Sequence, residues 1–356
     1  MSPSNAARAA VPAIGDADSR VPLHARMDIG EHVVALAWSR DGGALALAGA
    51  DGGVHLLDSV AGARTTRVGE HAAGALAVAF SRDGATLISG GQDGTLQVFA
   101  RDGLQPPRRI VMEQAWVGQI ACSVDGTRVA AAAGRHVSIH DARTLDVVHQ
   151  FAPLPATVEA LAFSPNGRQL AAASYGGLQL LTPFSPFTTR KLAWTGACLS
   201  VAWRPDASVI AAGGQDASVQ FWRLPKGQHA AMSGYAIKVR NIAWNGSGRW
   251  LATGGGSDVV LWDFKSGPEG RPPRSLRYHH ERIVGLCWQR KGPLLASIAR
   301  DSTLLLWHPG RSELPVARYQ LASLPTAIAW SPDDSLLALG GEDGTLAIIQ
   351  PEPVLQ

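Results

Sequence analysis

The chain has few cysteines, no excess of one charge and no long apolar runs, and each shortage excludes a class of protein. Its 356 residues contain three cysteines, Cys122, Cys198 and Cys287, which are far apart and set in apolar surroundings. Their odd number and wide spacing argue against a disulfide framework or a zinc site and predict reduced core thiols. The formal net charge of +3 gives no electrostatic case for nucleic acid or an anionic membrane as a partner.

No apolar stretch reaches the roughly 20 residues that a membrane-spanning helix needs. The first residues also lack the continuous apolar core of a secretory signal. We therefore expect no membrane partner and a disordered tail over residues 1–17, with an Ala-Arg-rich leader as the alternative. The composition further suggests a cytoplasmic protein of bacterial type.

The sequence does contain a repeat. A segment of about two dozen residues recurs at intervals of about 42 residues, eight times in all. One anchor position in the eight copies reads Trp38, Phe80, Cys122, Phe163, Trp203, Trp244, Trp288 and Trp330. Such periods mark folds in which one unit cannot bury its own hydrophobic face, so that neighbouring units must cover it. We predict one closed domain over residues 18–350, followed by a short tail over residues 351–356.

Each copy divides in the same way. An alternating strand ends at the anchor and is followed by a polar turn, such as residues 39–42, where Asp and Gly suit a tight hairpin. A second strand rich in Ala and Leu leads through another turn, such as residues 91–94, into a third strand. A more variable fourth strand reaches the next copy. Four antiparallel strands per unit, repeated radially, predict a β-propeller.

The two ends of the repeat array predict how the ring closes. The last copy finishes its third strand at Ile348 and Ile349 and has too little chain left for a fourth. Residues 21–27 precede the first full copy and have the position of an unattached fourth strand. We expect this strand to pair with the last sheet, because ring closure removes the exposed sheet edges.

Several recurring features carry a family resemblance. They are the lead-ins Glu70-His71 and Tyr278-His279, the Ser-x-Asp-Gly and Gly-x-Asp-Gly turns, and the terminal Trp262-Asp263. On these residues the chain resembles WD40-repeat proteins across residues 18–350. Eight copies then predict an all-β, eight-bladed propeller with four strands per blade. Gly134 and Tyr175 stand where the turn Asp is expected, so seven blades plus an irregular segment is the alternative.

His279, Ser297, Asp301 and Trp307 could be mistaken for a catalytic or metal-binding set. The resemblance implies that residues at these positions form a structural relay of hydrogen bonds within one blade. A buried Asp needs donors, which the imidazole, hydroxyl and indole N–H supply. A shorter version is expected from His71, Ser89 and Asp93, with Phe99 in place of the indole.

The sequence lacks the common catalytic and cofactor-binding motifs. The sequence contains no Gly-x-Ser-x-Gly elbow, phosphate-binding glycine loop or His-Glu-x-x-His. In His279-His280-Glu281, adjacent side chains point in different directions, which does not suit a metal. We predict a non-enzymatic protein without cofactor or metal. The alternative is a small-molecule, metal or catalytic site at the central channel, built from His32, Tyr175 and Glu159.

The resemblance implies that partners dock on one face, where the fourth-to-first and second-to-third strand loops emerge. The residues mapped to that face are Lys238, Arg240, Arg282, Arg300, Trp116, His32, Glu159, Gln92, Gln215 and Glu342, with Thr157, Ser174, Leu76, Leu199 and Leu324. The four cations fall on neighbouring copies and should form a basic sector. Trp116, with Leu76 and Leu199 nearby, should offer an apolar anchor.

These positions predict a scaffold that binds a protein or peptide segment bearing acidic side chains. Membership of a larger complex is left open. Nucleic-acid contact through the basic sector is a weaker alternative, because the aromatic residues that would interleave with the bases are missing.

Overall fold

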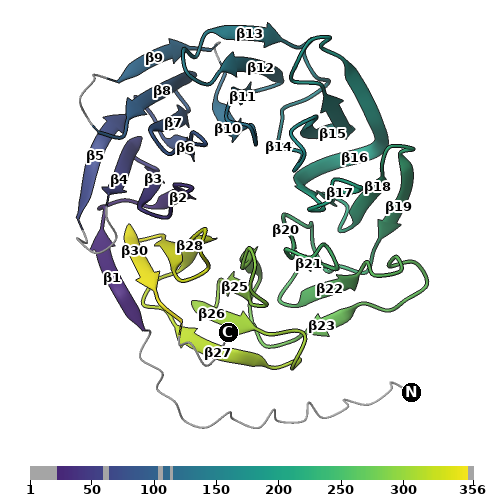
Figure 1. Cartoon of the computed structure of the whole chain (residues 1–356). Coiled ribbons are helices and arrows are strands. Elements are labelled where there is room, and N and C mark those ends of the chain that lie inside the picture. Colours follow the sequence, from purple (N-terminus) through teal and green to yellow (C-terminus); the bar gives the residue numbers. More distant parts are fainter. Residues whose placement is uncertain (1–21, 59–63, 103–106, 113–114, 352–356) are drawn as a thin grey trace, which may run out of the picture.

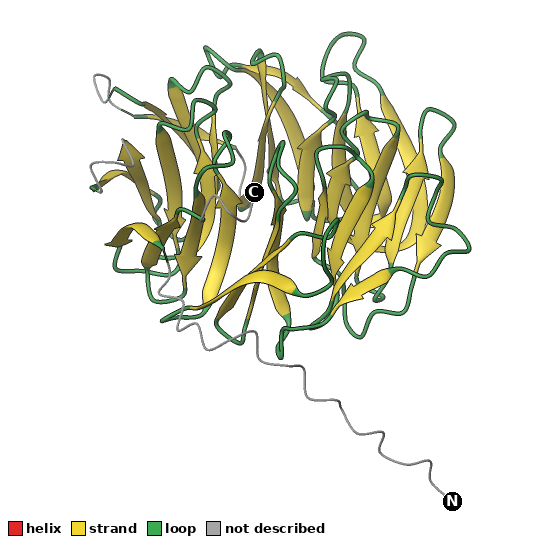
Figure 2. Cartoon of the chain, turned by 60° about the horizontal axis from the view of Figure 1, so that its bottom comes forward, coloured by secondary structure: helices red, strands yellow, loops and turns green. Residues whose placement is uncertain are grey.

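The computed structural model describes residues 22–58, 64–102, 107–112 and 115–351. All regular structure in this part of the chain is β, with thirty strands arranged around a central opening (Figure 1). A tilted view shows the strands running between two loop-bearing faces (Figure 2). None of the described residues belongs to a helix long and apolar enough to cross a membrane. The all-β propeller is confirmed; residues 1–17 and 352–356, predicted to be tails, lie outside the described residues.

Strands follow one another from the centre of the ring outward. The inner strands are β2 (Val33–Trp38), β6 (Ala75–Phe80), β10 (Val117–Cys122), β14 (Ala160–Phe163), β20 (Asn241–Trp244), β24 (Ile283–Trp288) and β28 (Pro325–Trp330). The second strands are β3 (Ala44–Gly49), β7 (Thr86–Gly91), β11 (Arg128–Ala133), β17 (Val209–Gly214), β21 (Trp250–Gly254), β25 (Leu295–Ala299) and β29 (Leu337–Gly341).

The outer half of the ring contains the remaining strands. The third strands are β4 (Gly53–Asp58), β8 (Thr95–Ala100), β12 (His136–Asp141), β18 (Val219–Arg223), β22 (Val259–Asp263), β26 (Thr303–Trp307) and β30 (Thr345–Ile349). The outer strands are β5 (Thr65–Glu70), β9 (Arg108–Val111), β13 (Val147–Gln150), β19 (Gln228–Met232), β23 (Arg274–Leu276), β27 (Pro315–Gln320) and β1 (Leu23–Asp28). Two longer strands are β15 (Leu170–Leu181) and β16 (Thr189–Trp203).

Small side chains on the second strands let neighbouring sheets pack closely. Every residue of β3 is buried, and Ala44 and Ala46 pack in one apolar cluster with Phe80, Leu87 and Phe99 of the next sheet. Because interiors are packed at near-crystalline density, each large aromatic needs a small residue opposite it. The alternation of Ala-rich strands and aromatic anchors thus places the core between the sheets, all the way around the ring.

Hydrogen bonding groups the strands into seven sheets, six with four strands and one with six. The prediction of an eight-bladed propeller with four strands per blade is therefore wrong, because the ring has seven blades. The fourth and fifth copies of the repeat share the six-stranded sheet, whose order is β14-β15-β16-β17-β18-β19. The alternative count of seven is thus correct, but it arises because one strand continues from the fourth copy into the fifth, and no irregular segment is needed.

Strand β16 is the element that joins these two copies. Its first part pairs with β15, for example Lys191 opposite Gln179. Its last part pairs with β17, for example Trp203 opposite Ile210. The strand therefore crosses from the outside of the ring to the centre without a break (Figure 1). At the other junctions whose residues are all described, a loop makes this crossing.

The ring closes as predicted, through the N-terminal strand. Strand β1 pairs antiparallel with β30, with Ala25 opposite Ile348 and Met27 opposite Leu346. The closing sheet has the order β1-β30-β29-β28, so the two ends of the domain are joined by main-chain hydrogen bonds. The strand lies one or two residues later than expected, and residue 21 falls outside the described residues.

The anchor tryptophans tie neighbouring inner strands together. Each donates its indole N–H to the carbonyl that precedes the anchor of the copy before it. The pairs are Trp38 with Ala329, Trp203 with Ala162, Trp244 with Ala202, Trp288 with Ala243 and Trp330 with Cys287. Phe80, Cys122 and Phe163 have no such N–H, so three junctions lack this bond.

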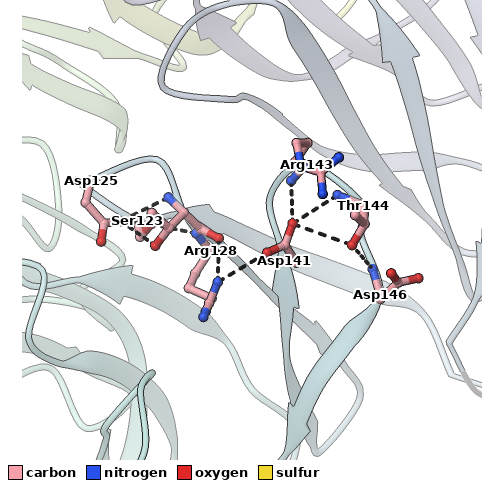
Figure 3. A network of polar contacts seen from close by, with 8 residues as sticks. Ser123, Asp125, Arg128, Asp141, Arg143, Thr144 and Asp146 are labelled. Atoms are coloured by element: carbon pink, nitrogen blue, oxygen red, sulfur yellow. Dashed lines mark hydrogen bonds and ion pairs between the residues drawn. The ribbon is translucent and has the colours of Figure 1, made fainter.

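Carboxylates stabilise turns on the face of the ring where the loops between third and outer strands lie. In the third copy Asp141 takes the place of the terminal Asp of the repeat, and its Oδ1 accepts from the N–H groups of Arg143 and Thr144, each at 3.0 Å (Figure 3). Its Oδ2 lies 3.4 Å from Nη1 of Arg128. The backbone bonds, that of Thr144 foremost, lower the pKa of Asp141. This face therefore has a structural use for its acidic residues.

Candidate functional site

The face expected to meet partners carries two sets of loops. One set leads from an outer strand into the next inner strand, and the other joins second and third strands. We call it the loop face. Arg282 precedes β24, while Arg300 follows β25, and the N–H of Arg300 donates to the carbonyl of Arg282 at 3.0 Å. A backbone hydrogen bond thus places two predicted site residues side by side.

Three cations of the predicted basic sector are free. Lys238, Arg282 and Arg300 are exposed, and in the described parts of the chain their side chains make no hydrogen bond or ion pair. Surface cations of globular proteins commonly have acidic neighbours, and such pairs are worth little. A group of unpaired cations on neighbouring copies instead gives a positive local potential that attracts anionic groups.

Arg240, the fourth member, differs from the other three. Its Nη1 lies 3.5 Å from Oε2 of Glu159, and the two side chains are 50% and 37% exposed. Glu159 directly precedes β14, whereas Arg240 directly precedes β20. The pair therefore joins the fourth copy to the sixth and passes by the fifth. Sequence reasoning placed both residues on this face but did not predict that they would pair.

The apolar part of the loop face differs from the prediction. Trp116 is 62% exposed, as an anchor for a partner requires. Leu199, however, is only 6% exposed, and Leu76 is half-buried, so these two leucines are less accessible to a partner than the prediction requires. Ile237, 42% exposed beside Lys238, was missed. An apolar residue next to a lysine in a polar turn was the signal that could have revealed it.

The remaining predicted residues differ in accessibility. Gln215 and Glu342 are exposed, while His32 and Gln92 are half-buried. Of the additional positions, Thr157 is exposed, Leu324 is half-buried and Ser174 is buried. The loop face therefore offers fewer contacts than the sequence mapping implied, and its accessible chemistry lies mainly in cations and scattered apolar side chains.

A chain of hydrogen bonds connects the side chains around His279. The Trp307 indole N–H donates to Ser297 Oγ at 2.8 Å, and Ser297 Oγ lies 2.8 Å from His279 Nε2. On its other side, His279 Nδ1 contacts Thr303 Oγ1 at 2.8 Å and Asp301 at 3.3 Å. Burial lowers the pKa of His279, so a neutral imidazole links the hydroxyls.

The carboxylate at the end of this chain is stabilised in its charged form. Burial alone would raise the pKa of Asp301, but hydrogen bonds from Thr303 and the His280 N–H outweigh it and lower the pKa. The polar atoms of this relay thereby bond to one another within the blade. Around His71, Ser89 and Asp93 the same contacts occur at 2.8 and 2.9 Å.

The sixth copy has a variant of this relay that sequence reasoning missed. Its tryptophan, Trp262, donates its indole N–H to the Tyr235 hydroxyl at 2.7 Å, and that hydroxyl lies 2.7 Å from Thr253 Oγ1. Burial raises the pKa of Tyr235 to about 12. The signal available in the sequence was Trp262 itself, since a buried indole N–H needs an acceptor and this copy has no histidine lead-in.

The part of the chain that the structure describes contains no group of three or more His, Cys, Asp or Glu side chains placed to hold a metal ion. Of the residues suspected for a channel site, Glu159 pairs with Arg240, Tyr175 is 60% exposed and His32 is half-buried. His280 is exposed while its neighbour His279 is buried, as adjacent residues of an extended segment should be.

Comparison with protein families agrees with the geometry of the ring. The model for the WD domain, G-beta repeat, matches five segments, residues 63–99, 188–223, 228–263, 270–308 and 321–349. The chain belongs to the WD40 family. The segments without a match include the third copy, where the turn Asp is replaced by Gly134. The family resemblance drawn from the turns and the Trp-Asp terminus is thus confirmed.

Curated relatives resemble part of this WD40 protein. The chromatin assembly factor 1 subunit FAS2 homolog of Oryza sativa is 23% identical over 169 residues, 44% of this chain and 34% of the relative. Protein FIZZY-RELATED 1 of Arabidopsis thaliana is 30% identical over 145 residues, 40% of this chain and 30% of the relative. The chain spans about a third of the length of these relatives, which are eukaryotic. The cytoplasmic, bacterial origin stays a prediction.

Solved structures share the fold over nearly the whole chain. Sqt1 of Chaetomium thermophilum, bound to the N-terminus of the ribosomal protein L10, has a TM-score of 0.80 at 19% identity and covers 93% of this chain and 100% of that one. The computationally designed Ika8 protein has a TM-score of 0.77 at 18% identity, with the same coverages. At such low identity these likenesses show the fold alone and nothing about partners.

Proposed function

We propose that this WD40 protein is an interaction scaffold that binds an acidic protein or peptide segment on its loop face. The observation that carries the proposal is the set of three exposed cations, Lys238, Arg282 and Arg300, without an anionic partner in the described residues. A backbone hydrogen bond places Arg282 and Arg300 in adjacent loops, and Arg forms strong, often bidentate, bonds with carboxylates.

The relatives support a role in protein binding. Sqt1, which shares the fold, holds the N-terminus of another protein, and a relative is named as a subunit of a chromatin assembly factor. A rigid ring with a closed core offers a partner a preformed surface, so little entropy is lost in ordering it. Both observations favour a binding role over a catalytic one for a chain whose polar relays are internally satisfied.

Apolar contacts would complement the charges. Ile237 lies next to Lys238 and can take an aliphatic group of the same segment. Trp116 belongs to the third copy, so a segment that reached it as well would cross the mouth of the channel. Trp and Arg are the residue types most often found at interface hot spots. We therefore propose a segment that combines several carboxylates with at least one apolar side chain.

A charge-reversal experiment tests the proposal. The double variant Arg282→Glu/Arg300→Glu should lose binding of a fluorescein-labelled octaglutamate peptide, measured by fluorescence anisotropy, while thermal unfolding stays within about 2 °C because surface substitutions rarely change stability. Arg290→Glu/Arg311→Glu is the matched control with the same change of charge, since Arg290 and Arg311 are exposed in loops at the other end of the same sheet. Equal affinity of the double variant and the wild type would discard the proposed site.

A further inference from the structure

At one position near the start of the inner strand, the fourth and sixth copies differ from all others because they have a charged residue. This position lies four residues before each anchor, where the inner strand begins. In six copies the residue there is uncharged: Val34, Leu76, Gly118, Leu199, Val284 and Thr326. The two charged residues at this position are Glu159 and Arg240, and they have opposite signs. These same two side chains form the ion pair across the fifth copy.

The intervening residue fits this arrangement. Leu199 has the equivalent position between Glu159 and Arg240 and is 6% exposed, whereas the uncharged residues at this position in the other copies are half-buried. The fifth copy therefore has a buried apolar residue at the position where the copies on either side of it have charged ones. The Glu159–Arg240 pair therefore joins equivalent positions of two copies, and is more than a chance contact between long side chains.

The pair is also weak enough to be replaced. Its N–O distance of 3.5 Å is long for an ion pair, and both side chains are substantially exposed. Pairs of this kind contribute about 0–1 kcal/mol. A carboxylate delivered by a bound segment, held nearby by Lys238, Arg282 and Arg300, would therefore compete with Glu159 for the same guanidinium at little cost.

We infer that Glu159 is an internal competitor, which occupies Arg240 in the free protein and is displaced by a carboxylate of the bound segment. This inference rests on the proposed function and assigns Glu159 the role of a specificity-determining residue. Segments without a carboxylate at the right place leave the Glu159–Arg240 pair intact and gain nothing from Arg240. Segments that have one exchange a weak internal pair for an intermolecular contact.

The test uses the full-length chain and fluorescein-labelled octaglutamate. Glu159→Gln should tighten binding about threefold, since a weak exposed pair corresponds to at most about a fivefold change in affinity. Glu159→Asp keeps the charge but shortens its reach, so it should tighten binding too. In an Arg240→Gln background, Glu159→Gln should have no more effect than Asp146→Asn, an equal charge change at an exposed turn of the opposite face.

Each other result contradicts the inference. If Glu159→Gln tightens binding equally with and without Arg240, Glu159 only repels acidic segments through its charge. If Glu159→Asp binds like the wild type while Glu159→Gln binds more tightly, the same repulsion explains the data. If the wild type binds octaglutamate but no Glu159 variant differs from it, the competitor role is wrong and the scaffold function stands. If no form binds the peptide, both proposals fall.

Discussion

The indole N–H of Trp38 donates a hydrogen bond of 3.1 Å to the carbonyl of Ala329, 291 residues away in sequence. This bond joins the first inner strand to the last one and so lies at the centre of the closed ring, whereas the pairing of β1 with β30 closes the outside. Thr326 reinforces the same junction, because its hydroxyl donates to the carbonyl of Val33 at 2.6 Å. The ring is thus closed by hydrogen bonds both between its inner strands and at its outer edge.

We expect Trp38→Phe to destabilise the protein by about 1 kcal/mol, because the Ala329 carbonyl loses its donor while most of the apolar contact is kept. Urea unfolding followed by intrinsic fluorescence would measure the change. Trp116→Phe is the control, since the exposed Trp116 makes no such bond in the described residues. Identical midpoints for the wild type and Trp38→Phe would show that this hydrogen bond does not contribute to closure.

A second prediction concerns the junctions whose anchors are Phe80, Cys122 and Phe163. Without an indole bond, these junctions should open more often than those at Trp244, Trp288 and Trp330. Amides of β10 should therefore exchange with deuterium faster than amides of β24, as measured by native-state exchange and mass spectrometry. Equal protection of the two strands would mean that side-chain packing alone determines how easily the inner strands separate.

A third prediction is a dependence of stability on acid. A hydrogen bond from the Ser39 hydroxyl, together with the Gly43 N–H and Arg101, lowers the pKa of Asp41 from 3.8 to about 2. A carboxyl with a depressed pKa in the folded state stabilises it above its ordinary pKa, and this contribution disappears as the pH falls from about 4 to about 2. The stability difference between the wild type and Asp41→Asn should therefore shrink over that range.

Urea midpoints at a series of pH values would measure that difference. Asp146→Asn should show no comparable narrowing, since Asp146 makes no side-chain hydrogen bond in the described residues. A gap between the wild type and Asp41→Asn that stays constant from pH 5 to about pH 2 would contradict the assignment of this turn as an acid-sensitive element.

The fourth prediction addresses the relay of the sixth copy. Tyr235→Phe removes the acceptor of the Trp262 N–H and leaves that donor without a partner in the described structure. An unsatisfied buried donor costs about 1–3 kcal/mol, so the thermal midpoint should fall clearly. Tyr175→Phe removes the same atom from an exposed side chain and should leave the midpoint unchanged. A Tyr235→Phe variant as stable as the wild type would show that Thr253 or water replaces the hydroxyl.

The repeat period predicted the ring because the fold is itself periodic. The anchor position was visible in the sequence, and the indole bonds of Trp203 and Trp244 explain why tryptophan recurs there. Closure by the N-terminal strand was also predictable, since a last copy that ends at Ile349 has to obtain its outer strand from elsewhere. These features follow from the need of every sheet to bury both faces.

What sequence reasoning missed depends on contacts between copies. The continuity of β16 arises where an outer strand meets the next inner strand without a turn, and residues 194–197 contain no feature that distinguishes an extended link from a loop. The exposure of Leu199 was overestimated for a related reason, since neither the ion pair between Glu159 and Arg240 nor the packing of the fifth copy is visible in one repeat alone.

The undivided strand β16 has a consequence for how this protein can be cut or rebuilt. Most repeats here end in a loop and can be treated as modules, but the fourth and fifth copies have no boundary between them. Deleting, duplicating or transplanting either one alone would split a hydrogen-bonded strand and leave unpaired strand edges on both sides. Any rearrangement of the array, in evolution or in the laboratory, must therefore keep these two copies together as one structural unit.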